Sequence, residues 1–359
     1  MIFEKLKYNP VNILPNSGEI KSISPSNIAL VKYWGKKPIQ IPTNPSISFT
    51  LKNCHSQTSI SFKKSNSFTF DFKIDGKSDK SFIPKIESFF NRIKNFTPFL
   101  FEYQIQIISE NTFPHSSGIA SSASGFSALA LAITQLEQKI TGFSDEDKYL
   151  KASYLSRLGS GSASRSLYGP CAIWGYHKDV INSNDEFAIE YQNIHSNFKN
   201  YQDTILLIDK GVKKVSSSTG HNLMHNHPFS KERFSQANKN LNETISILEK
   251  GDLEKFISVT ESEALTLHAM MMTSNPYFIL MKEGTLSVIE KVWEFRKSSD
   301  VPLCFTLDAG ANVHLLYPDN YKQTVLNFID NELIVYCENQ QYICDEVGSG
   351  AKIINENYA

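Results

Sequence analysis

The sequence predicts an α+β fold, because segments with the periodicity of strands are mixed with segments with the periodicity of helices. Apolar and polar residues alternate strictly over residues 68–74, as in a strand with one buried face, and Asp75-Gly76 follows as a turn. Between Phe126 and Ile140, apolar residues instead recur every three or four positions, as on one face of a helix. Several predicted strands follow one another in hairpin order, which favours α+β over a doubly wound parallel sheet.

The first half of the chain predicts strands and helices in mixed order. Short apolar or alternating runs predict strands at residues 27–34, 46–51, 68–74, 103–109 and 171–176. A spacing of three or four between apolar residues predicts helices at residues 83–93 and 149–157, besides the one around 126–140. The stretch Asn182-Ser-Asn-Asp-Glu186 is polar and typical of a turn. We therefore expect two domains, residues 1–186 and residues 187–359.

The second half predicts the same mixture of elements. Short apolar runs at residues 204–209 and 303–308 are expected to form strands. Apolar residues spaced along 234–248 predict a helix that Gly251 ends, since glycine readily adopts the left-handed conformation found after the last helical residue. A later helix is expected over residues 286–293.

Composition excludes several classes of protein. A chain of 359 residues is long enough for two domains with their own cores. Its formal net charge of −1 argues against non-specific nucleic-acid binding, which needs a basic face. The sequence contains no apolar run of membrane-spanning length, and its N-terminus lacks the form of a secretory signal. The five cysteines are scattered without metal-site spacing, so we expect reduced thiols and a cytoplasmic protein.

One glycine- and serine-rich loop predicts a phosphate site. The loop, Asn111-Thr-Phe-Pro-His-Ser-Ser-Gly-Ile-Ala-Ser-Ser-Ala-Ser-Gly125, connects the strand at 103–109 to the following helix. Such a loop exposes backbone N–H groups, and the helix dipole adds to their attraction for phosphate. The hydroxyls of Ser121 and Ser122 can bind a phosphate oxygen or a bound Mg²⁺. The alternative is a loop without a ligand, in which Ser121 is a helix N-cap.

The segment Ser26-Asn-Ile-Ala-Leu-Val-Lys-Tyr-Trp-Gly-Lys36 could serve an anionic ligand. Lys32 and Lys36 flank Tyr33 at the end of a predicted strand. Lysine is a compact charge suited to phosphate, and tyrosine offers a hydroxyl. The alternative is an edge strand with solvated lysines.

Two later segments supply an arginine and an aspartate. In Arg157-Leu-Gly-Ser-Gly-Ser-Ala-Ser-Arg-Ser-Leu-Tyr-Gly169, Arg165 could bind a carboxylate in two-point contact, or it could be a surface residue at a helix end. In Leu303-Cys-Phe-Thr-Leu-Asp-Ala-Gly-Ala-Asn312, Asp308 follows an apolar strand and precedes small residues. That leaves room for a ligand, although Asp-Ala-Gly also forms ordinary turns.

Taken together and in this order, these segments resemble those of the diphosphomevalonate decarboxylases. That family belongs to the small-molecule kinase superfamily of galactokinase, homoserine kinase and mevalonate kinase. The resemblance extends from about Ser24 to the Val347-Gly-Ser-Gly-Ala351 segment. The phosphate loop alone would indicate only the superfamily. The Lys32-Tyr-Trp-Gly-Lys36 and Gly159-Ser-Gly-Ser-Ala-Ser-Arg165 motifs indicate the decarboxylase branch more narrowly.

The resemblance implies a fold and a reaction. The fold would be of the GHMP-kinase type, with a ribosomal-protein-S5-like N-terminal domain, a ferredoxin-like C-terminal domain and the active site in the cleft. The reaction converts (R)-5-diphosphomevalonate and ATP to isopentenyl diphosphate, ADP, phosphate and CO₂, with Mg²⁺ as cofactor. Family members are commonly homodimers, so we expect a homodimer without nucleic-acid or membrane partners.

The resemblance also implies roles for individual residues. Asp308 would accept or orient the proton of the tertiary hydroxyl, and Arg165 would hold the substrate carboxylate. Lys36 would lie near the reacting hydroxyl and the transferred phosphate. Ser122 would bind the ATP phosphates and the metal. Other expected nucleotide-binding residues are Pro114, Ser117, Gly118, Ile119, Ala120 and Ser121. Other expected substrate-binding residues are Tyr33, Trp34, Gly35, Ser160, Gly161, Ser162, Ala163, Ser164 and Ser218.

The chain departs from the family pattern at several positions. It has His221 where the family usually has methionine after the glycine, Ala311 where it usually has proline, and His115-Ser116-Ser117 where it usually has Thr-Ala-Ala. The roles of His221, His225 and His227 stay open at this point, including a structural metal. Two other functions also stay open, a kinase for a related mevalonate that does not eliminate phosphate and a non-catalytic ligand sensor.

Overall fold

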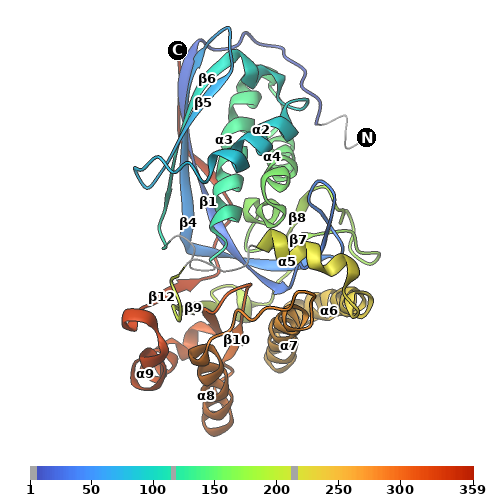
Figure 1. The fold of residues 1–359 in the computed structure, drawn as a ribbon, viewed down its shortest axis with the longest axis vertical. Coiled ribbons are helices and arrows are strands. Elements are labelled where there is room, and N and C mark those ends of the chain that lie inside the picture. Colours follow the sequence, from blue (N-terminus) through green and yellow to red (C-terminus); the bar gives the residue numbers. More distant parts are fainter. Residues whose placement is uncertain (1–5, 115–118, 212–216) are drawn as a thin grey trace.

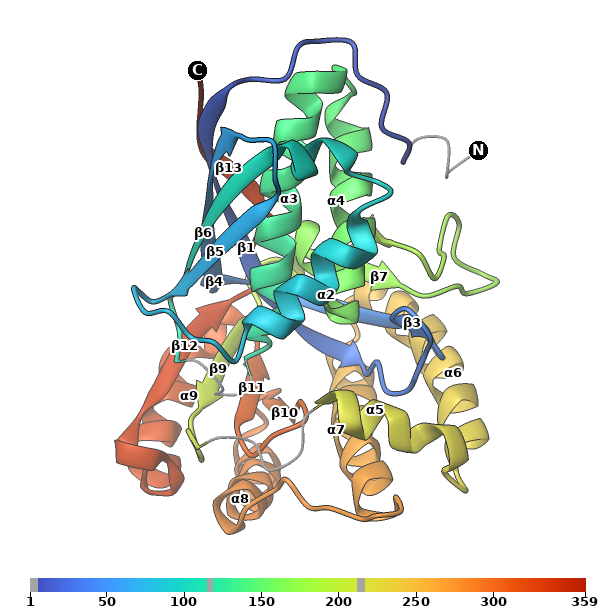
Figure 2. The same ribbon diagram turned by 45° about the horizontal axis from the view of Figure 1, so that its top comes forward.

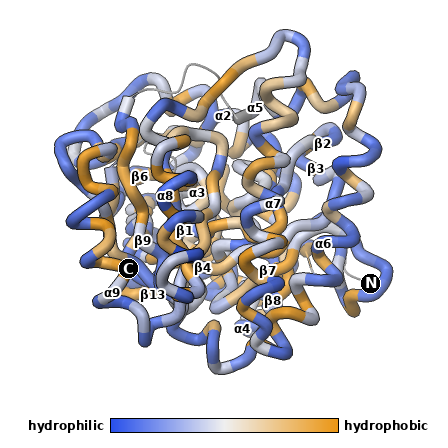
Figure 3. Tube along the Cα trace, turned by 90° about the horizontal axis from the view of Figure 1, so that it is seen from below, coloured by the Kyte–Doolittle hydropathy of each residue, from blue (hydrophilic) through white to orange (hydrophobic). Residues whose placement is uncertain are grey.

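The computed structural model describes residues 6–114, 119–211 and 217–359. Figures 1 and 2 show a large sheet covered by helices above a smaller sheet with its own helices, so the predicted mixture of strands and helices is confirmed. Figure 3 shows hydrophilic stretches mainly on the outside of the molecule, with apolar residues nearer its middle. Within the described part of the chain, every helix is too short or too polar to cross a membrane.

The first sheet is built on two long antiparallel strands, β1 (Ser17–Val31) and β4 (Ser46–Lys64). It has seven strands, in the order β13-β1-β4-β6-β5, with β7 paired to β4 and β8 paired to β7. The β5 strand runs parallel to β6, and the other pairs are antiparallel. The remaining bounds are β5 (Thr69–Ile74), β6 (Tyr103–Asn111), β7 (Cys171–Trp174), β8 (Ala188–Tyr191) and β13 (Lys352–Tyr358).

Three helices cover one face of this sheet: α2 (Ile83–Ile93), α3 (Ser121–Thr141) and α4 (Asp145–Gly159) (Figure 2). The α3 helix is buried along most of its length, because its alanine, leucine and isoleucine side chains pack between the sheet and the other two helices. It ends at Gly142, which has a positive φ of 69°. This packing fixes the direction of α3, so its N-terminus has one defined position.

The second sheet has the order β10-β11-β9-β12 and is antiparallel throughout. Its strands are β9 (Gln202–Leu206), β10 (Cys304–Thr306), β11 (Val313–Tyr317) and β12 (Tyr342–Glu346). Helices α6 and α7 lie beside each other below the lower end of the first sheet (Figure 1). The helices of this half are α5 (Ser217–Leu223), α6 (Ser230–Lys250), α7 (Leu253–Met272), α8 (Glu283–Ser299) and α9 (Lys322–Phe328), and a short ribbon in the first half pairs β2 (Lys36–Lys37) with β3 (Ile41–Pro42).

Several predicted elements differ from the observed ones at their ends. The helix at 83–93 is confirmed at both ends. The predicted strand at 27–34 is wrong at its C-terminal end, because β1 stops at Val31. The predicted strand at 303–308 likewise stops at Thr306. The β1 strand ends directly before Lys32, and β10 ends two residues before Asp308, so both charged residues lie outside the sheets.

Candidate active site

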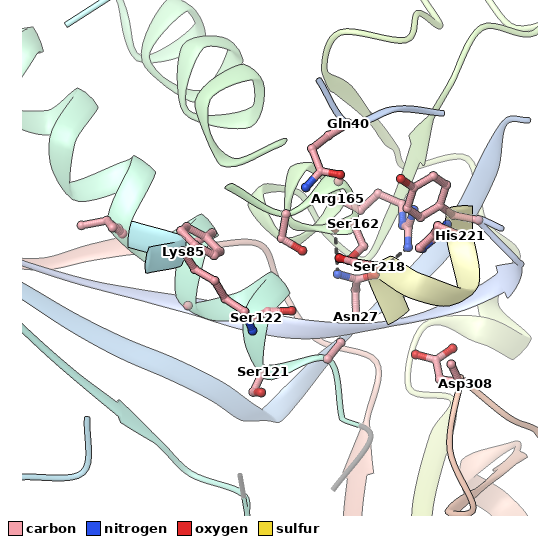
Figure 4. Close-up of a pocket in the computed structure, with 18 of the residues that line it drawn as sticks. Asn27, Gln40, Lys85, Ser121, Ser122, Ser162, Arg165, Ser218, His221 and Asp308 are labelled. Atoms are coloured by element: carbon pink, nitrogen blue, oxygen red, sulfur yellow. Dashed lines mark hydrogen bonds between the residues drawn. The ribbon is translucent and has the colours of Figure 1, made fainter. Parts of the chain in front are cut away.

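A pocket of about 590 Å³ is lined by the first sheet and its helices together with α5, α7 and the segment at Asp308, and most of the predicted site residues line it (Figure 4). Those in its wall are Tyr33, Trp34, Lys36, Ala120, Ser121, Ser122, Ser160, Gly161, Ser162, Arg165, Ser218 and Asp308. Five other predicted residues do not line it: Pro114, which is exposed, and Gly35, Ile119, Ala163 and Ser164, which support the wall from behind. Ser117 and Gly118 lie outside the described residues.

Asp308 forms an ion pair with Lys32 across the pocket. The distance from Lys32 Nζ to Asp308 Oδ1 is 3.0 Å, and the lysine side chain is 2% exposed against 28% for the aspartate. Burial lowers the pKa of Lys32, and the neighbouring carboxylate opposes this shift. Lys32 is therefore the buried member of the pair, and Asp308 is the member that faces the pocket.

Lys36 takes a different position from Lys32. Its Nζ donates to Gln40 Oε1 at 3.1 Å rather than to Asp308. Burial, and then the charge of Arg92, lower the pKa of Lys36. The sequence suggested both lysines for an anion, and only the structure separates the one beside the aspartate from the one at the rim.

Arg165 places a buried cation in the pocket wall. Its guanidinium donates to Ser46 Oγ at 2.7 Å, to Ser48 Oγ at 3.1 Å and to Asn27 Oδ1 at 3.2 Å. These acceptors are neutral, and no carboxylate of the described residues lies within ion-pair distance. Burial lowers the pKa of Arg165 to about 10. A buried cation held by neutral oxygens favours an anionic ligand, because a charge of opposite sign would offset its desolvation.

Tyr33 and Gly161 depend on each other. The Tyr33 hydroxyl is buried without a hydrogen-bond partner in the described chain, and burial raises its pKa. A Cβ on Gly161 would lie 3.0 Å from Tyr33 Oη and 2.7 Å from the Trp174 ring. Glycine at this position therefore leaves room for the phenol, whose unsatisfied hydroxyl can bind a ligand.

The N-terminus of α3 faces the same pocket. Ala120 precedes the helix with a φ of 40°, and no side chain caps the first turn. Ser121 is thus the first helical residue, so its alternative interpretation as the N-cap is wrong. Ser26 Oγ donates to the carbonyl of Ile119 at 2.9 Å and anchors the chain just before the helix. A long helix with an uncapped N-terminus attracts an anion through its free N–H groups and its dipole.

The far end of the pocket was not predicted from the sequence. It is apolar, and Lys85 reaches from α2 toward Ser121 and Ser122 (Figure 4). Its apolar lining comprises Phe72, Ile74, Phe82, Ile86, Ile107, Phe126 and Leu129. In the sequence these apolar residues are indistinguishable from ordinary core residues, because no local motif indicates a ligand site. The pocket therefore joins a charged end around Arg165 and Asp308 to an apolar end beyond the α3 N-terminus.

The histidines near residue 221 have separate surroundings. His227 contacts the Met270 carbonyl at 3.0 Å and Thr273 Oγ1 at 3.1 Å through Nε2. His221 lines the pocket, whereas His225 is exposed. Among residues 6–114, 119–211 and 217–359, no three histidine, cysteine or acidic side chains gather as a metal site.

Comparison with known proteins places both halves of the chain in one family. Residues 24–188 match the model of the diphosphomevalonate decarboxylase-like N-terminal domain, and residues 204–356 match that of the mevalonate 5-diphosphate decarboxylase C-terminal domain. A diphosphomevalonate decarboxylase of Gibberella zeae is 30% identical over 317 residues, which are 82% of this chain and 80% of the relative. One of Candida albicans is 29% identical over 330 residues, covering 85% and 86%.

Solved structures of the family have the same fold. The mevalonate diphosphate decarboxylase of Staphylococcus aureus has a TM-score of 0.80 and 30% identity over 94% of this chain and 98% of its own. A structure described as MDDEF in complex with MVAPP, AMPPCP and magnesium has a TM-score of 0.81 and 26% identity, covering 94% and 99%. The two-domain GHMP-kinase-like fold expected from the sequence is confirmed by these similarities.

The buried imidazole of His221 gives a pH prediction. Burial, then the charges of Lys36 and Arg165, lower its pKa to about 3, whereas an unfolded histidine titrates near pH 6.5. As the pH falls below about 6.5, the unfolded chain binds a proton that the folded chain does not. The free energy of unfolding should therefore fall by up to about 1.4 kcal/mol per pH unit relative to His221→Asn, measured by urea denaturation between pH 7 and 5. Parallel curves for the two proteins would contradict it.

Proposed function

The chain belongs to the diphosphomevalonate decarboxylase family, and on this premise we propose how its residues convert (R)-5-diphosphomevalonate and ATP to isopentenyl diphosphate, ADP, phosphate and CO₂. One observation carries the proposal. A single pocket holds the Lys32–Asp308 pair, the Arg165 cation without a carboxylate partner in the described chain, and the uncapped N-terminus of α3. These groups match the hydroxyl, the carboxylate and the phosphates that the reaction brings together.

The order of steps follows from the substrate's chemistry. Hydroxide is a poor leaving group, so the tertiary alcohol first takes the terminal phosphoryl group of ATP, giving ADP. The C–O bond to the new phosphate then breaks, and positive charge develops at that carbon. The electron pair of the adjacent carboxylate-bearing bond moves in to form the alkene as CO₂ departs. Phosphoryl transfer depends mainly on positioning and charge neutralisation.

Asp308 acts on the tertiary hydroxyl in this proposal. Its carboxylate faces the pocket and accepts or orients the hydroxyl proton during phosphoryl transfer. Lys32 Nζ, 3.0 Å from the carboxylate, adds positive charge where the phosphoryl group arrives. A positioned general base typically contributes about a hundredfold to ten-thousandfold in rate.

The other end of the pocket suits ATP. The N–H groups at the start of α3 and the hydroxyls of Ser121 and Ser122 bind the phosphate chain, with Lys85 beside them. The apolar lining beyond them accommodates the adenine ring. A relative described with MVAPP and AMPPCP supports simultaneous binding of both substrates in this fold.

The residues present also fit Mg²⁺. This ion is usually held by one or two protein oxygens together with substrate phosphates and water. The Ser122 hydroxyl, in the pocket wall at the start of α3, supplies such an oxygen, and no acidic cluster of the described residues competes for the ion. When bound, Mg²⁺ neutralises charge on the nucleotide phosphates. The relative described with magnesium supports this assignment.

Arg165 and the rim residues would hold the second substrate. Arg165 takes the carboxylate through the guanidinium donors that its serine and asparagine partners leave free. The diphosphate is assigned to residues that line the same pocket: Tyr33, Lys36, Ser160, Ser162 and Ser218. Trp34, Gly35, Gly161, Ala163 and Ser164 shape the wall behind them.

We further propose a division into residues 1–186, with the nucleotide and substrate loops, and residues 187–359, with the aspartate. The family-model ranges 24–188 and 204–356 support it. Two strands of the second segment, β8 and β13, join the first sheet, so the segments are interlocked. The five unpaired cysteines support a cytoplasmic setting.

The homodimer is also a proposal, and sedimentation equilibrium, which measures the mass of the particle in solution, tests it.

The Asp308→Asn variant tests the proposed mechanism. The amide cannot take up the hydroxyl proton, so turnover should fall by about a thousandfold or more while the affinity for AMPPCP stays within about threefold. CO₂, isopentenyl diphosphate and ADP are measured after incubation with ATP and diphosphomevalonate. Asp319→Asn, at an exposed position, is the matched control.

The wild-type products separate the alternatives. A phosphorylated acid that accumulates without CO₂ would indicate a kinase. Binding of both ligands without ADP release would indicate a sensor. Either result, or full activity of Asp308→Asn, would contradict the proposal.

A further inference from the structure

A fully buried ion pair lies directly behind Lys32. Arg233 of α6 and Glu263 of α7 have side chains that are 0% exposed. Arg233 Nη1 donates to Glu263 Oε1 at 2.9 Å, and Asn240 Nδ2 donates to the same oxygen at 2.6 Å. Removing two charges from water costs more than such a pair usually returns, so stability alone gives it little reason to exist.

The pair binds the backbone of Lys32 on both sides. Glu263 Oε2 accepts from the Lys32 N–H at 2.8 Å, and Arg233 Nη2 donates to the Lys32 carbonyl at 3.2 Å. Asn44 Nδ2 donates to the same carbonyl at 3.0 Å. Lys32 is the first residue after β1, so the sheet no longer holds its peptide groups. The contacts from α6 and α7 take the place of the missing strand partner.

We propose that Arg233 and Glu263 are positioning residues, which hold the Lys32 ammonium against Asp308. The inference rests on the proposed function, because it gives Arg233 and Glu263 a role in placing Lys32 beside Asp308, the acid that acts on the tertiary hydroxyl of the substrate. It also connects the two halves of the molecule. The N-terminal half supplies Lys32, the C-terminal half supplies Asp308, and the buried pair sets the distance between them. A displacement of about 1 Å in such a site can cost about a hundredfold in rate.

The test replaces the pair by apolar residues of similar volume. Such exchanges of buried ion pairs are often neutral or stabilising, so Arg233→Met/Glu263→Leu should melt within a few degrees of the wild type. We expect kcat to fall about a hundredfold, with affinities for AMPPCP and diphosphomevalonate within about threefold. A crystal structure should show Lys32 Nζ more than about 4 Å from Asp308 Oδ1, beyond ion-pair distance.

The matched control is another buried pair, Lys151 with Glu137, which joins α4 to α3 and does not line the pocket. Lys151→Met/Glu137→Leu should keep the wild-type kcat. If the Arg233/Glu263 double variant fails to fold, Glu263→Gln decides, with an expected tenfold loss of kcat. A folded variant with wild-type kcat and an intact Lys32–Asp308 distance overturns the proposal. If the wild type releases no CO₂, the proposed function is refuted instead. The distance from Lys32 Nζ to Asp308 Oδ1 in the double variant still tests the positioning role of Arg233 and Glu263.

A second inference comes from His221, on independent observations. Its ring packs against Tyr33 and Trp34, with centroids 4.3 Å and 4.7 Å away. Its Nδ1 accepts from the Gly35 N–H at 2.9 Å, which leaves the proton of the neutral ring on Nε2. Within the described chain Nε2 has no hydrogen-bond partner, and the residue lines the pocket beside Ser218 and Arg165 (Figure 4).

We infer that His221 determines specificity by donating from Nε2 to an oxygen of the substrate diphosphate. This inference also rests on the proposed function. The ring lies against Tyr33, which faces the phosphates, and its charge state is fixed because burial and two nearby cations oppose protonation. A methionine at this position would have no hydrogen to donate. The chain thus places a neutral donor in the wall of the pocket.

Three substitutions separate the two nitrogens of the ring. His221→Asn keeps an acceptor for the Gly35 N–H but loses the distant donor, whereas His221→Gln keeps a donor near the Nε2 position. His221→Met loses both. Affinities for diphosphomevalonate and for unphosphorylated mevalonate are measured by calorimetry without ATP, and melting temperatures check the fold.

Met and Asn variants should bind diphosphomevalonate about tenfold more weakly, and Gln should recover to within about threefold of the wild type. Affinity for mevalonate should stay unchanged in all three. Wild-type affinity for diphosphomevalonate in the Met or Asn variant, or an equal loss for both ligands, overturns the inference. Because calorimetry needs no turnover, a missing CO₂ product bears on the proposed function and leaves this result intact.

Discussion

The ion pair between Lys32 and Asp308 is the contact on which the site depends. Its members come from opposite halves of the molecule, 276 positions apart in the sequence. They meet outside the sheets, because β1 ends directly before Lys32 and β10 ends two residues before Asp308. The pair therefore exists only while the two sheets keep their relative position, and this couples the chemistry of the pocket to the packing of α6 and α7 under the first sheet.

The pocket concentrates positive charge in a chain that is nearly neutral overall. Lys32, Lys36, Lys85 and Arg165 line it, against Asp308 as an acidic counterpart. The formal net charge of the whole chain is −1, so this excess is local. Two polyanionic substrates must lie side by side for phosphoryl transfer. Cations on fixed elements reduce their mutual repulsion before the reaction begins, and the low polarity of the surroundings strengthens each contact.

The sequence predicts the fold class and much of the pocket wall, because short motifs encode local geometry. The glycine- and serine-rich loop before α3 predicts an exposed helix N-terminus, and the motif around Arg165 predicts a cation in the pocket wall. Other features depend on distant parts of the chain. The choice between Lys32 and Lys36 follows from where β1 ends, and the apolar lining around Phe126 looks like any core. Glu263 lies 231 positions from Lys32, and no local pattern connects them.

The β13 strand affects how the first sheet folds during synthesis. It pairs with β1, so residues 352–358 complete a sheet whose first strand begins at Ser17. During synthesis, one edge of β1 stays unpaired until residues 352–358 have been translated. An uncovered strand edge invites pairing with other chains, which makes nascent polypeptides of this architecture natural clients for chaperones. The first sheet is thus completed only when residues 352–358 have joined β1.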